Sequence, residues 1–361
     1  MKRTIVFVLI GLLALAGCGP GPTTPTEAPT PTAPPEPRTL RVMTHDSFDI
    51  SEETIAAFEE QHNAQVEILQ AGDAGVVLNQ AILSRDNPLA DVIYGVDNTL
   101  LSRALDAGIL ESYASPLLAD VPDRLELDPQ HRALPVDYGD VCLNYDKGWF
   151  AEHNLMPPAG LEDLVKAKHR GLTVVENPAT SSPGLAFLLA TVGHFGETGS
   201  YTWLDYWADL RDNDVLVVEG WSEAYYDQFT LYGGGDRPIV VSYASSPPVE
   251  VYFAEEPFEE APTAAVVSDG SCFRQIEFVG ILKGAQNRDL AEAWVDFMLG
   301  TTFQEDIPLH MFMFPANENA ALPEVFAKFA VIPEHPAEVD YAAIEANREA
   351  WVEAWTETVL R

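Results

Sequence analysis

The first third of the chain alternates short apolar runs with amphipathic stretches. Residues 39–48 alternate apolar and polar positions, which predicts a strand, and residues 51–63 follow as a helix that Ser51 can cap. The same pattern continues with predicted strands at 64–72 and 90–98 and predicted helices at 75–86 and 100–110. This β-α-β-α-β-α order predicts a parallel sheet covered by helices.

A second series of elements follows further along the chain. It comprises predicted strands at 171–178, 215–220, 237–247 and 273–282 and predicted helices at 182–196, 202–213, 289–300 and 341–360. About 320 residues from Thr39 onward are enough for two domains. We therefore expect an α/β protein of two lobes, with the chain crossing between them more than once. Ligands of such sheets collect at the carboxyl ends of the strands, so the loops there form the candidate site.

These loops are rich in aromatic, acidic and hydroxyl side chains. His45, Asp46 and Ser47 follow the first strand, Asp97 ends the third, and Tyr243 ends a later one. Asp46 and Asp97 also suit ordinary turns, because an Asp side chain can bond to the backbone that follows it. Two interpretations stay open: turn residues, or polar groups that converge on one cleft.

The loop at 180–184, with the sequence "TSSPG", predicts the start of a helix. Ser182 is the expected cap, and Pro183 suits the first helical position. The free backbone N–H groups of a helix start attract anions. Together with the hydroxyl of Ser181, they are therefore candidates to hold an anionic or hydroxyl group of a ligand.

The segment "GWSEAYYDQF" at 220–229 concentrates aromatic rings. Trp221, Tyr225 and Phe229 are spaced four residues apart, which predicts a buried stripe of a helix. Trp221 directly follows Gly220 at the end of a predicted strand. It is therefore the best candidate of the three for the wall of a cleft.

The N-terminus has the features of an export signal. Lys2 and Arg3 precede an apolar run that is too short for a comfortable membrane span and that ends in small residues, so residues 1–17 read as a signal peptide. "LAGC" resembles the bacterial lipobox, which implies a lipid on Cys18; a plain signal peptide with an incidental Cys is the alternative. Residues 18–38, rich in Pro and Thr, then predict an extended tether. We expect an exported protein anchored at the extracytoplasmic face of the membrane, in the periplasm or on the cell surface.

Composition narrows the choice of ligand. The chain is 47% hydrophobic and has a net charge of −36. Such a surface repels nucleic acid and attracts cations, although acidity can also serve solubility in a salty or acidic habitat.

Cys142 and Cys272 lie in two strand-like stretches of the body, and in an exported protein they can form a disulfide. The sequence alone leaves that pairing open.

Five motifs together resemble one protein family. "VMTHDSF", "DVIYGVDNTLL", "NPATSSPGLAFLL", "GWSEAYYDQF" and "VVSYASSPP" are similar, in order and spacing, to segments of thiamine-binding proteins of bacterial ABC importers. The resemblance runs from Thr39 to Arg361. It implies a type II periplasmic-binding-protein fold, with two α/β lobes joined by a hinge of crossing strands. Lobe 1 would comprise 39–137 plus 275–361, and lobe 2 would comprise 138–274.

The resemblance also implies a ligand site and partners. The ligand would be thiamine or a thiamine phosphate, clamped between the lobes, and the partner an ABC permease. The residues assigned to the site are His45, Asp46, Ser47, Asp97, Ser181, Trp221, Tyr225, Tyr243 and Phe312. His45 stands where the family often has Tyr, and Phe312 stands where it has a ligand-facing Trp. Both replacements keep a planar ring but weaken it as a platform for a cation, and a protonated His45 would repel the thiazolium.

Two other function classes are the alternatives to a thiamine-binding protein. A ferric-ion-binding lipoprotein of the same fold would use the adjacent Tyr225 and Tyr226 as phenolate ligands. An enzyme is disfavoured because the sequence has no HExxH, GxSxG, CxxC or P-loop motif. We therefore expect a monomeric binding protein without catalytic activity, cofactor or bound metal.

Overall fold

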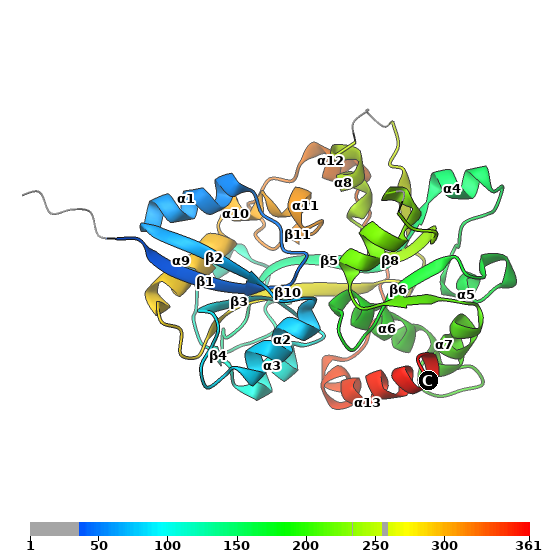
Figure 1. Cartoon of the computed structure of the whole chain (residues 1–361), viewed down its shortest axis with the longest axis horizontal. Coiled ribbons are helices and arrows are strands. Elements are labelled where there is room, and N and C mark those ends of the chain that lie inside the picture. The colour runs from blue at the N-terminus through cyan, green and yellow to red at the C-terminus, as the bar shows by residue number, and fades with distance from the viewer. Residues whose placement is uncertain (1–35, 233, 255–258) are drawn as a thin grey trace, which may run out of the picture. The chain divides into compact units, whose positions relative to one another are not determined.

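The computed structural model describes residues 36–361, apart from 233, 255–258 and the side chain of residue 232. The predicted signal peptide, Cys18 and most of the tether lie outside the described residues. The strands are β1 (Arg38–Thr44), β2 (Ala64–Gln70), β3 (Val92–Asp97), β4 (Leu110–Glu111), β5 (Leu134–Asp146), β6 (Thr173–Glu176), β7 (Leu216–Val218), β8 (Ile239–Tyr243), β9 (Thr263–Val266), β10 (Phe273–Leu282) and β11 (Phe314–Pro315). They form one sheet with the main order β2-β1-β3-β10-β5-β8-β6-β7 (Figure 1).

In the part of the chain that the structure describes, each of the seven predicted helices is present, and six further short helices were not predicted from the sequence. The helices are α1 (Glu52–His62), α2 (Ala74–Leu83), α3 (Leu101–Ala107), α4 (Lys147–Glu152), α5 (Leu161–Leu164), α6 (Ser182–Phe195), α7 (Trp203–Asp212), α8 (Ser246–Tyr252), α9 (Arg288–Leu299), α10 (Thr301–Gln304), α11 (Ile307–His310), α12 (Glu324–Phe329) and α13 (Tyr341–Val359). Short 3-10 turns and one π-helix, Glu223–Gln228, complete the connections. The predicted strand at 237–247 is wrong in its second half, because Pro247 and Pro248 begin α8 there.

The sheet is parallel at its two ends and antiparallel in the middle. β1 pairs in parallel with β2 and β3, and β6 pairs in parallel with β7 and β8. The long strands β5 and β10 run antiparallel to each other and to their neighbours β8 and β3. The parallel arrangement predicted for the first third of the chain is confirmed for β1, β2 and β3, whereas the centre of the sheet is antiparallel. β5 carries the chain from one end of the sheet to the other, and β10 carries it back. Each is therefore antiparallel to the neighbouring strand at the end that it enters, β5 to β8 and β10 to β3.

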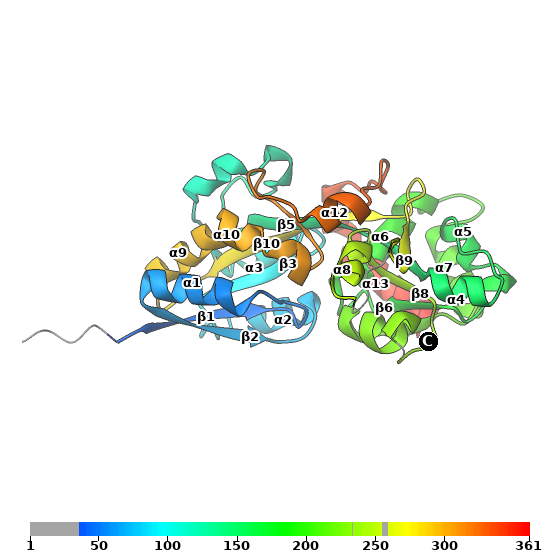
Figure 2. The same cartoon turned by 90° about the horizontal axis from the view of Figure 1, so that it is seen from above.

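The two ends form separate layers of helix and strand (Figure 2). The first lobe is built on β1, β2 and β3 with α1, α2, α3 and α9, and the second lobe on β6, β7 and β8 with α4, α6 and α7. The crossing strands β5 and β10 connect them, which confirms the predicted hinge. Cys142 on β5 is bonded to Cys272, which directly precedes β10, with their Cα atoms 4.4 Å apart. The disulfide therefore ties the two crossing strands together at the second lobe.

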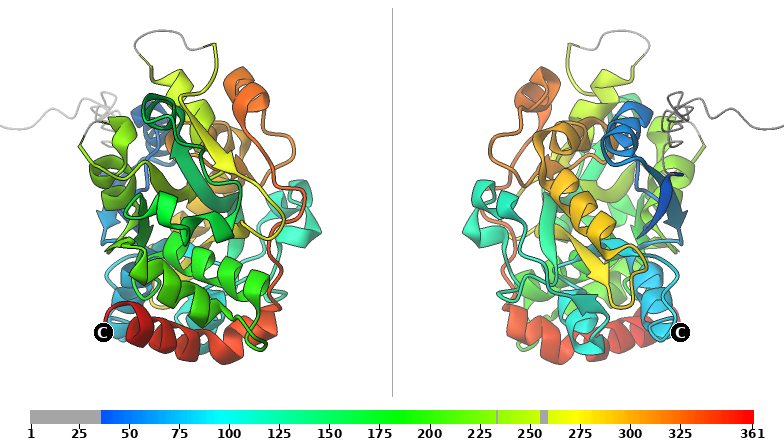
Figure 3. Two further views of the ribbon diagram at one scale, coloured as in Figure 1. Left: turned by 90° about the vertical axis from the view of Figure 1, so that its right-hand side faces the viewer. Right: turned by 90° about the vertical axis from the view of Figure 1, so that its left-hand side faces the viewer.

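Helix α13, which the predicted division groups with lobe 1, packs against the second lobe (Figure 3). Its Trp355 packs edge-to-face on Trp207 of α7, with ring centroids 5.5 Å apart. Its Arg348 reaches the first lobe, where Nη1 donates to the backbone oxygen of Thr99 at 3.1 Å. The C-terminal helix thus contacts both lobes. Among the residues described here, no helix has both the length and the apolarity needed to cross a bilayer.

Candidate functional site

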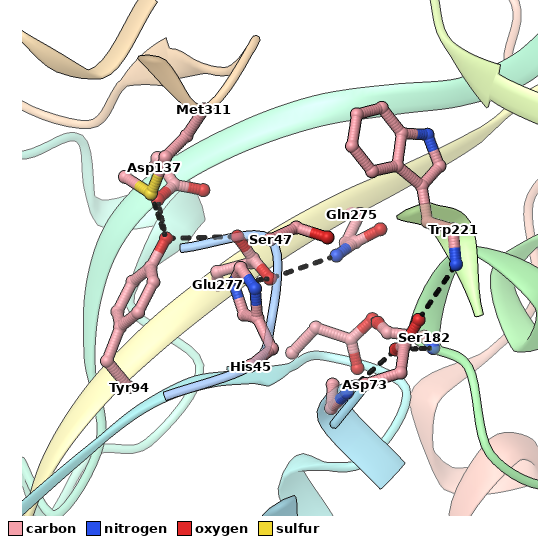
Figure 4. Close-up of polar contacts among 12 residues, drawn as sticks. His45, Ser47, Asp73, Tyr94, Asp137, Ser182, Trp221, Gln275, Glu277 and Met311 are labelled. Carbon is pink, nitrogen blue, oxygen red and sulfur yellow. Dashed lines mark hydrogen bonds and ion pairs between the residues drawn. The ribbon is translucent and has the colours of Figure 1, made fainter. Parts of the chain in front are cut away.

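A cavity of about 310 Å³ lies where the loops of the two lobes meet the crossing strands. Six of the nine predicted site residues line it: His45, Asp46, Ser47, Trp221, Tyr243 and Phe312. Figure 4 shows the polar contacts around it, with His45 and Ser47 from the first lobe near Trp221 from the second. The volume is at the lower end of the range for small-molecule sites. Loops that are far apart in the sequence therefore do converge on one site.

Asp97 lies behind the cavity, where it is a turn residue, as one of the two interpretations predicted, and also bonds to the second lobe. Its Oδ1 accepts bonds from the backbone N–H groups of Thr99 and Leu100 at 3.0 and 3.1 Å, as a turn residue does. Its Oδ2 accepts a bond from Ser182 Oγ of the second lobe. Burial raises the pKa of Asp97 to about 6, although hydrogen bonds from Ser182 and Thr99 act in the opposite direction. Asp97 therefore connects the lobes without lining the cavity.

The start of α6 differs from the prediction by one residue. Ser181, with an extended backbone, is the cap, and its Oγ accepts from Gly184 N at 3.4 Å. Ser182, the predicted cap, is the first helical residue, and its hydroxyl is thereby directed at Asp97. Of these residues, Ser182 and Pro183 line the cavity and Ser181 does not.

The aromatic segment at 220–229 is partly wall and partly core. Trp221 lines the cavity, and its Nε1 donates to Ser242 Oγ at 2.9 Å. Tyr225 stacks behind it, with ring centroids 4.8 Å apart, and its hydroxyl donates to Glu250 at 2.5 Å. Phe229 is fully buried. Tyr225 is therefore placed to support Trp221, and its bond to Glu250 gives no support to the iron alternative.

Three rings from different parts of the chain meet at the cavity. Trp221 lies edge-to-face with Phe312 at 5.7 Å and tilted against Tyr243 at 6.3 Å between ring centroids. Phe312 has a positive φ of 62°, which is unfavourable for a bulky residue. The hydroxyl of Ser245 in the second lobe donates to its backbone oxygen and helps to hold this conformation. The rings are thus positioned by contacts that join the lobes.

A buried polar network, which sequence reasoning missed, forms the floor of the cavity (Figure 4). The hydroxyl of Tyr94 lies 2.5 Å from Asp137 Oδ2 and 3.0 Å from Glu277 Oε2. Gln275 donates to Glu277 at 3.3 Å and accepts from the hydroxyl of Tyr243 at 3.2 Å. The available signal was the pair Gln275 and Glu277, two residues apart, in the mostly apolar stretch "FRQIEFVGIL".

His45 sets the charge of this network. Its Nε2 lies 3.6 Å from Glu277 Oε1, a distance suited to an ion pair but too long for a direct hydrogen bond. Burial raises the pKa of Glu277, but the charge of His45, contact with it, and hydrogen bonds from Tyr94 and Asp137 together outweigh that effect and lower the pKa below its usual range. Burial raises the pKa of Asp137 well above its usual range, and the nearby charge of Glu277 adds to the increase. Glu277 is therefore the charged carboxylate and Asp137 the protonated one.

The cavity lining is acidic. It contains four carboxylates, those of Asp46, Asp49, Asp73 and Glu277, and its described residues include no lysine or arginine. Aromatic faces and carboxylates together attract organic cations. A small, flat cation is therefore the ligand class that fits this site.

The two lobes also touch directly beside the cavity. Ser47 Oγ and Ser222 Oγ are 3.0 Å apart. The backbone N–H of Gly75, in the first turn of α2, donates to Thr180 O at 3.1 Å. A Cβ at residue 75 would lie 2.7 Å from that oxygen, so only glycine permits this approach. The edges of the cavity thus depend on both lobes being in contact.

Comparison with known proteins places the chain in a family. The model for bacterial extracellular solute-binding proteins matches residues 87–332. The thiamine-binding periplasmic protein of Escherichia coli K12 is 31% identical over 327 residues, which cover 89% of this chain and 94% of that relative. The solved structure of a periplasmic thiamin binding protein has a TM-score of 0.78 at 27% identity and covers 91% of this chain and 100% of its own.

A ferric binding protein from Campylobacter jejuni has a TM-score of 0.69 at 18% identity, with 88% of this chain and 99% of its own covered, so it shares the fold alone. The predicted two-lobed type II binding-protein fold is confirmed by these neighbours. Members of this family bind a small molecule outside the cytoplasm and work with an ABC permease. The chain belongs to the bacterial extracellular solute-binding proteins, in the group that includes the thiamine-binding periplasmic proteins.

Proposed function

We propose that this protein binds thiamine, or one of its phosphates, in the cavity between its lobes and delivers it to an ABC permease. The composition of the cavity carries the proposal. Three rings, those of Trp221, Tyr243 and Phe312, line it together with four carboxylates, and its described lining has no lysine or arginine. The thiamine-binding relatives support the same ligand.

Thiamine suits this combination of groups. It has a cationic thiazolium ring, a flat aminopyrimidine ring and a tail that ends in a hydroxyl or phosphate. An aromatic face attracts a cation by roughly 0.5 to 2 kcal/mol, and more when water is excluded. The rings of His45 and Phe312 are weaker platforms for a cation than the Tyr and Trp that they replace. The negative charge of Glu277, at the floor of the cavity, would compensate for that weakness.

Capture would work by closure of the lobes. A ligand that touches both lobes favours the form in which both sets of contacts exist. His45, Asp46, Ser47 and Phe312 would contribute from one side, and Trp221 and Tyr243 from the other, with Asp97, Ser181 and Tyr225 supporting them from behind. The division into lobe 1 (39–137 plus 275–361) and lobe 2 (138–274) remains part of the proposal, with α13 as the part of lobe 1 that also packs on α7 of lobe 2.

Export and anchoring belong to the same proposal. Residues 1–17 would direct secretion, Cys18 would carry the lipid, and 18–38 would tether a monomeric body to the membrane. We expect no catalytic activity and no cofactor. Replacement of Cys18 by Ser should move the protein from the membrane fraction to the soluble exported fraction. Retention of the variant in the membrane fraction would contradict the lipid anchor.

Fluorescence titration tests the ligand. Thiamine added to the purified protein should quench tryptophan emission saturably, because Trp221 lies at the cavity wall. A Trp221→Phe variant should lose most of that quenching while calorimetry still detects binding. If about 1 mM thiamine gives neither quenching nor a heat of binding, the binding free energy is weaker than about 4 kcal/mol. That result overturns the proposal.

A further inference from the structure

An arginine interrupts the apolar face of the C-terminal helix. The buried residues of α13 are Ile344, Arg348, Trp351 and Trp355, and a spacing of three or four residues places them on one face. Arg348 is only 7% exposed. Arginine is seldom buried to this extent unless its guanidinium group has partners. The partners of Arg348 therefore indicate what this face of the helix does.

The close partners of Arg348 belong to the first lobe. Its Nη1 donates to the backbone oxygen of Thr99 and to Ser102 Oγ, each at 3.1 Å. Thr99 is itself held in place, because its backbone N–H and its hydroxyl donate to Asp97 Oδ1 at 3.0 and 2.7 Å. Glu349 lies 3.4 Å from Nη2 but is 78% exposed, so it neutralises the charge only weakly. Arg348 thus bonds to a fixed turn of the first lobe through neutral acceptors.

The C-terminal half of α13 is fastened to the second lobe. Besides the ring contact with α7 described above, Trp351 Nε1 donates to Glu197 Oε2 at 2.9 Å. Arg211 of α7 donates from Nη1 to the backbone oxygen of Thr358 at 2.6 Å. Figure 1 shows α13 below α6 and α7, with its N-terminal end toward the middle of the molecule. One helix therefore has its anchor on one lobe and, at Arg348, a bond to the other.

The bonds of Arg348 lie away from the ligand. The lining of the cavity includes no residue of α13 among those that the structure describes. A hydrogen bond from a charged donor is stronger than one between neutral groups, yet water can replace it when the two groups separate. Such a bond favours contact between the lobes without making that contact permanent.

We propose that Arg348 is a positioning residue for closure, which slows the release of ligand from outside the cavity. The inference rests on the capture by closure proposed above. When the lobes part, α13 stays with the second lobe, and the bonds from Arg348 to Thr99 and Ser102 break. Opening must break these bonds as well as the contacts of the ligand, so the residence time depends on a side chain that the ligand does not touch.

Release rates of thiamine, measured by stopped-flow fluorescence, test this role. Arg348→Met keeps a long stem and removes the donors, so thiamine should leave about five- to tenfold faster, with affinity lowered by the same factor. Arg348→Lys restores a charged donor without the planar fork, and release should be only about twofold faster than in the wild type. A release rate in Arg348→Met equal to that of the wild type overturns the inference.

Arg211→Met is the matched control. It also removes a bond from an arginine to a backbone oxygen at α13, but that bond lies within the second lobe. Its release rate should stay within about twofold of the wild type, since the contact between the lobes is intact. The same increase in Arg211→Met and Arg348→Met would mean that both substitutions merely loosen the helix, which overturns a specific role for Arg348.

The ligand-free protein gives a second test, because the bonds of Arg348 need no ligand. Small-angle X-ray scattering should give a larger mean radius of gyration for Arg348→Met than for the wild type and Arg211→Met. Equal radii in the three proteins overturn the inference, whether or not thiamine binds. If the wild type binds no thiamine, the proposed function is wrong, and the scattering comparison alone decides the role of Arg348.

A variant on the first lobe covers the case in which Arg348→Met does not fold. Ser102→Ala removes one of the two acceptors of Arg348 and leaves α13 unchanged. Release should then be about twofold faster than in the wild type. An unchanged release rate in Ser102→Ala, with Arg348→Lys also unchanged, overturns the inference.

Discussion

The two sides of the cavity contribute different chemistry. Asp46, Asp49 and Asp73 come from loops of the first lobe, and Glu277 comes from the crossing strand β10. Trp221 and Tyr243, by contrast, follow or end strands of the second lobe. The first side and the crossing strand therefore supply the carboxylates of the described lining, and the second lobe supplies the ring faces of Trp221 and Tyr243. Neither side alone makes a site for an aromatic cation, so affinity depends on the contacts that hold the sides together.

Loss of the floor carboxylate should have the largest effect. Glu277→Gln keeps the shape of the side chain but removes the charge that His45 holds in the ionised form. We expect thiamine affinity to fall by about 3 kcal/mol, because a buried countercharge is lost. Calorimetry measures the change. Glu250→Gln is the control, since Glu250 is a buried carboxylate of the second lobe outside the cavity lining. Equal losses in the two variants would contradict a specific role for Glu277.

Loss of a ring from the second lobe should come next. Tyr243→Ala should weaken thiamine binding by roughly 1 to 3 kcal/mol if the ring stacks on the ligand. Tyr243→Phe keeps the ring and removes only the bond to Gln275, so its effect should be smaller. Dissociation constants from fluorescence titration separate the two cases. An unchanged constant in Tyr243→Ala removes this residue from the site, and equal losses in both variants assign its role to the hydroxyl.

The ring side of the cavity could be predicted from the sequence, whereas much of the acidic side could not. Trp221 and Tyr243 lie where predicted strands end, and the positions of strand ends follow from the hydrophobic pattern. Glu277 lies inside a strand, and its role depends on which strand becomes its neighbour. Asp73 is the cap of a helix, and caps are common, so nothing local distinguishes it from a structural residue.

The position of Tyr225 and the direction of the crossing strands also depend on more than the local sequence. A spacing of four residues correctly predicts that Tyr225 and Phe229 are buried, but it cannot indicate that a π-helix turns Tyr225 behind Trp221. Likewise, the pattern of β5 and β10 predicts buried strands but not their direction. That direction is set by the path of the chain between lobes, which is a property of the whole fold.

A change of pH should have a smaller effect on thiamine affinity, through the protonation of His45. Burial lowers the pKa of this imidazole, but the charge of Glu277 and contact with it outweigh burial and raise the pKa above its usual range. Protonated His45 repels a cation, so affinity should be highest above that raised pKa and should fall as the pH drops through it. The loss should reach at most about tenfold per pH unit.

Calorimetry from about pH 8 to about pH 6 measures this dependence. His45→Gln removes the titrating group and should give a nearly flat profile. A wild-type affinity that does not change with pH, or a variant with the same slope as the wild type, would rule out His45 as the titrating group.

The smallest effect on ligand binding should come from loss of the hydrogen bond between Ser47 and Ser222, which joins the two lobes directly. Ser47 Oγ and Ser222 Oγ, 3.0 Å apart and partly exposed, form a neutral hydrogen bond between the lobes, which is worth about 0.5 to 1 kcal/mol. Ser47→Ala and Ser222→Ala should each speed ligand release about two- to fivefold, and the double variant should be no worse than either one, because both remove the same bond. Stopped-flow release rates test this cycle. Additive effects would mean that each hydroxyl acts separately, which would contradict a shared bond between the lobes.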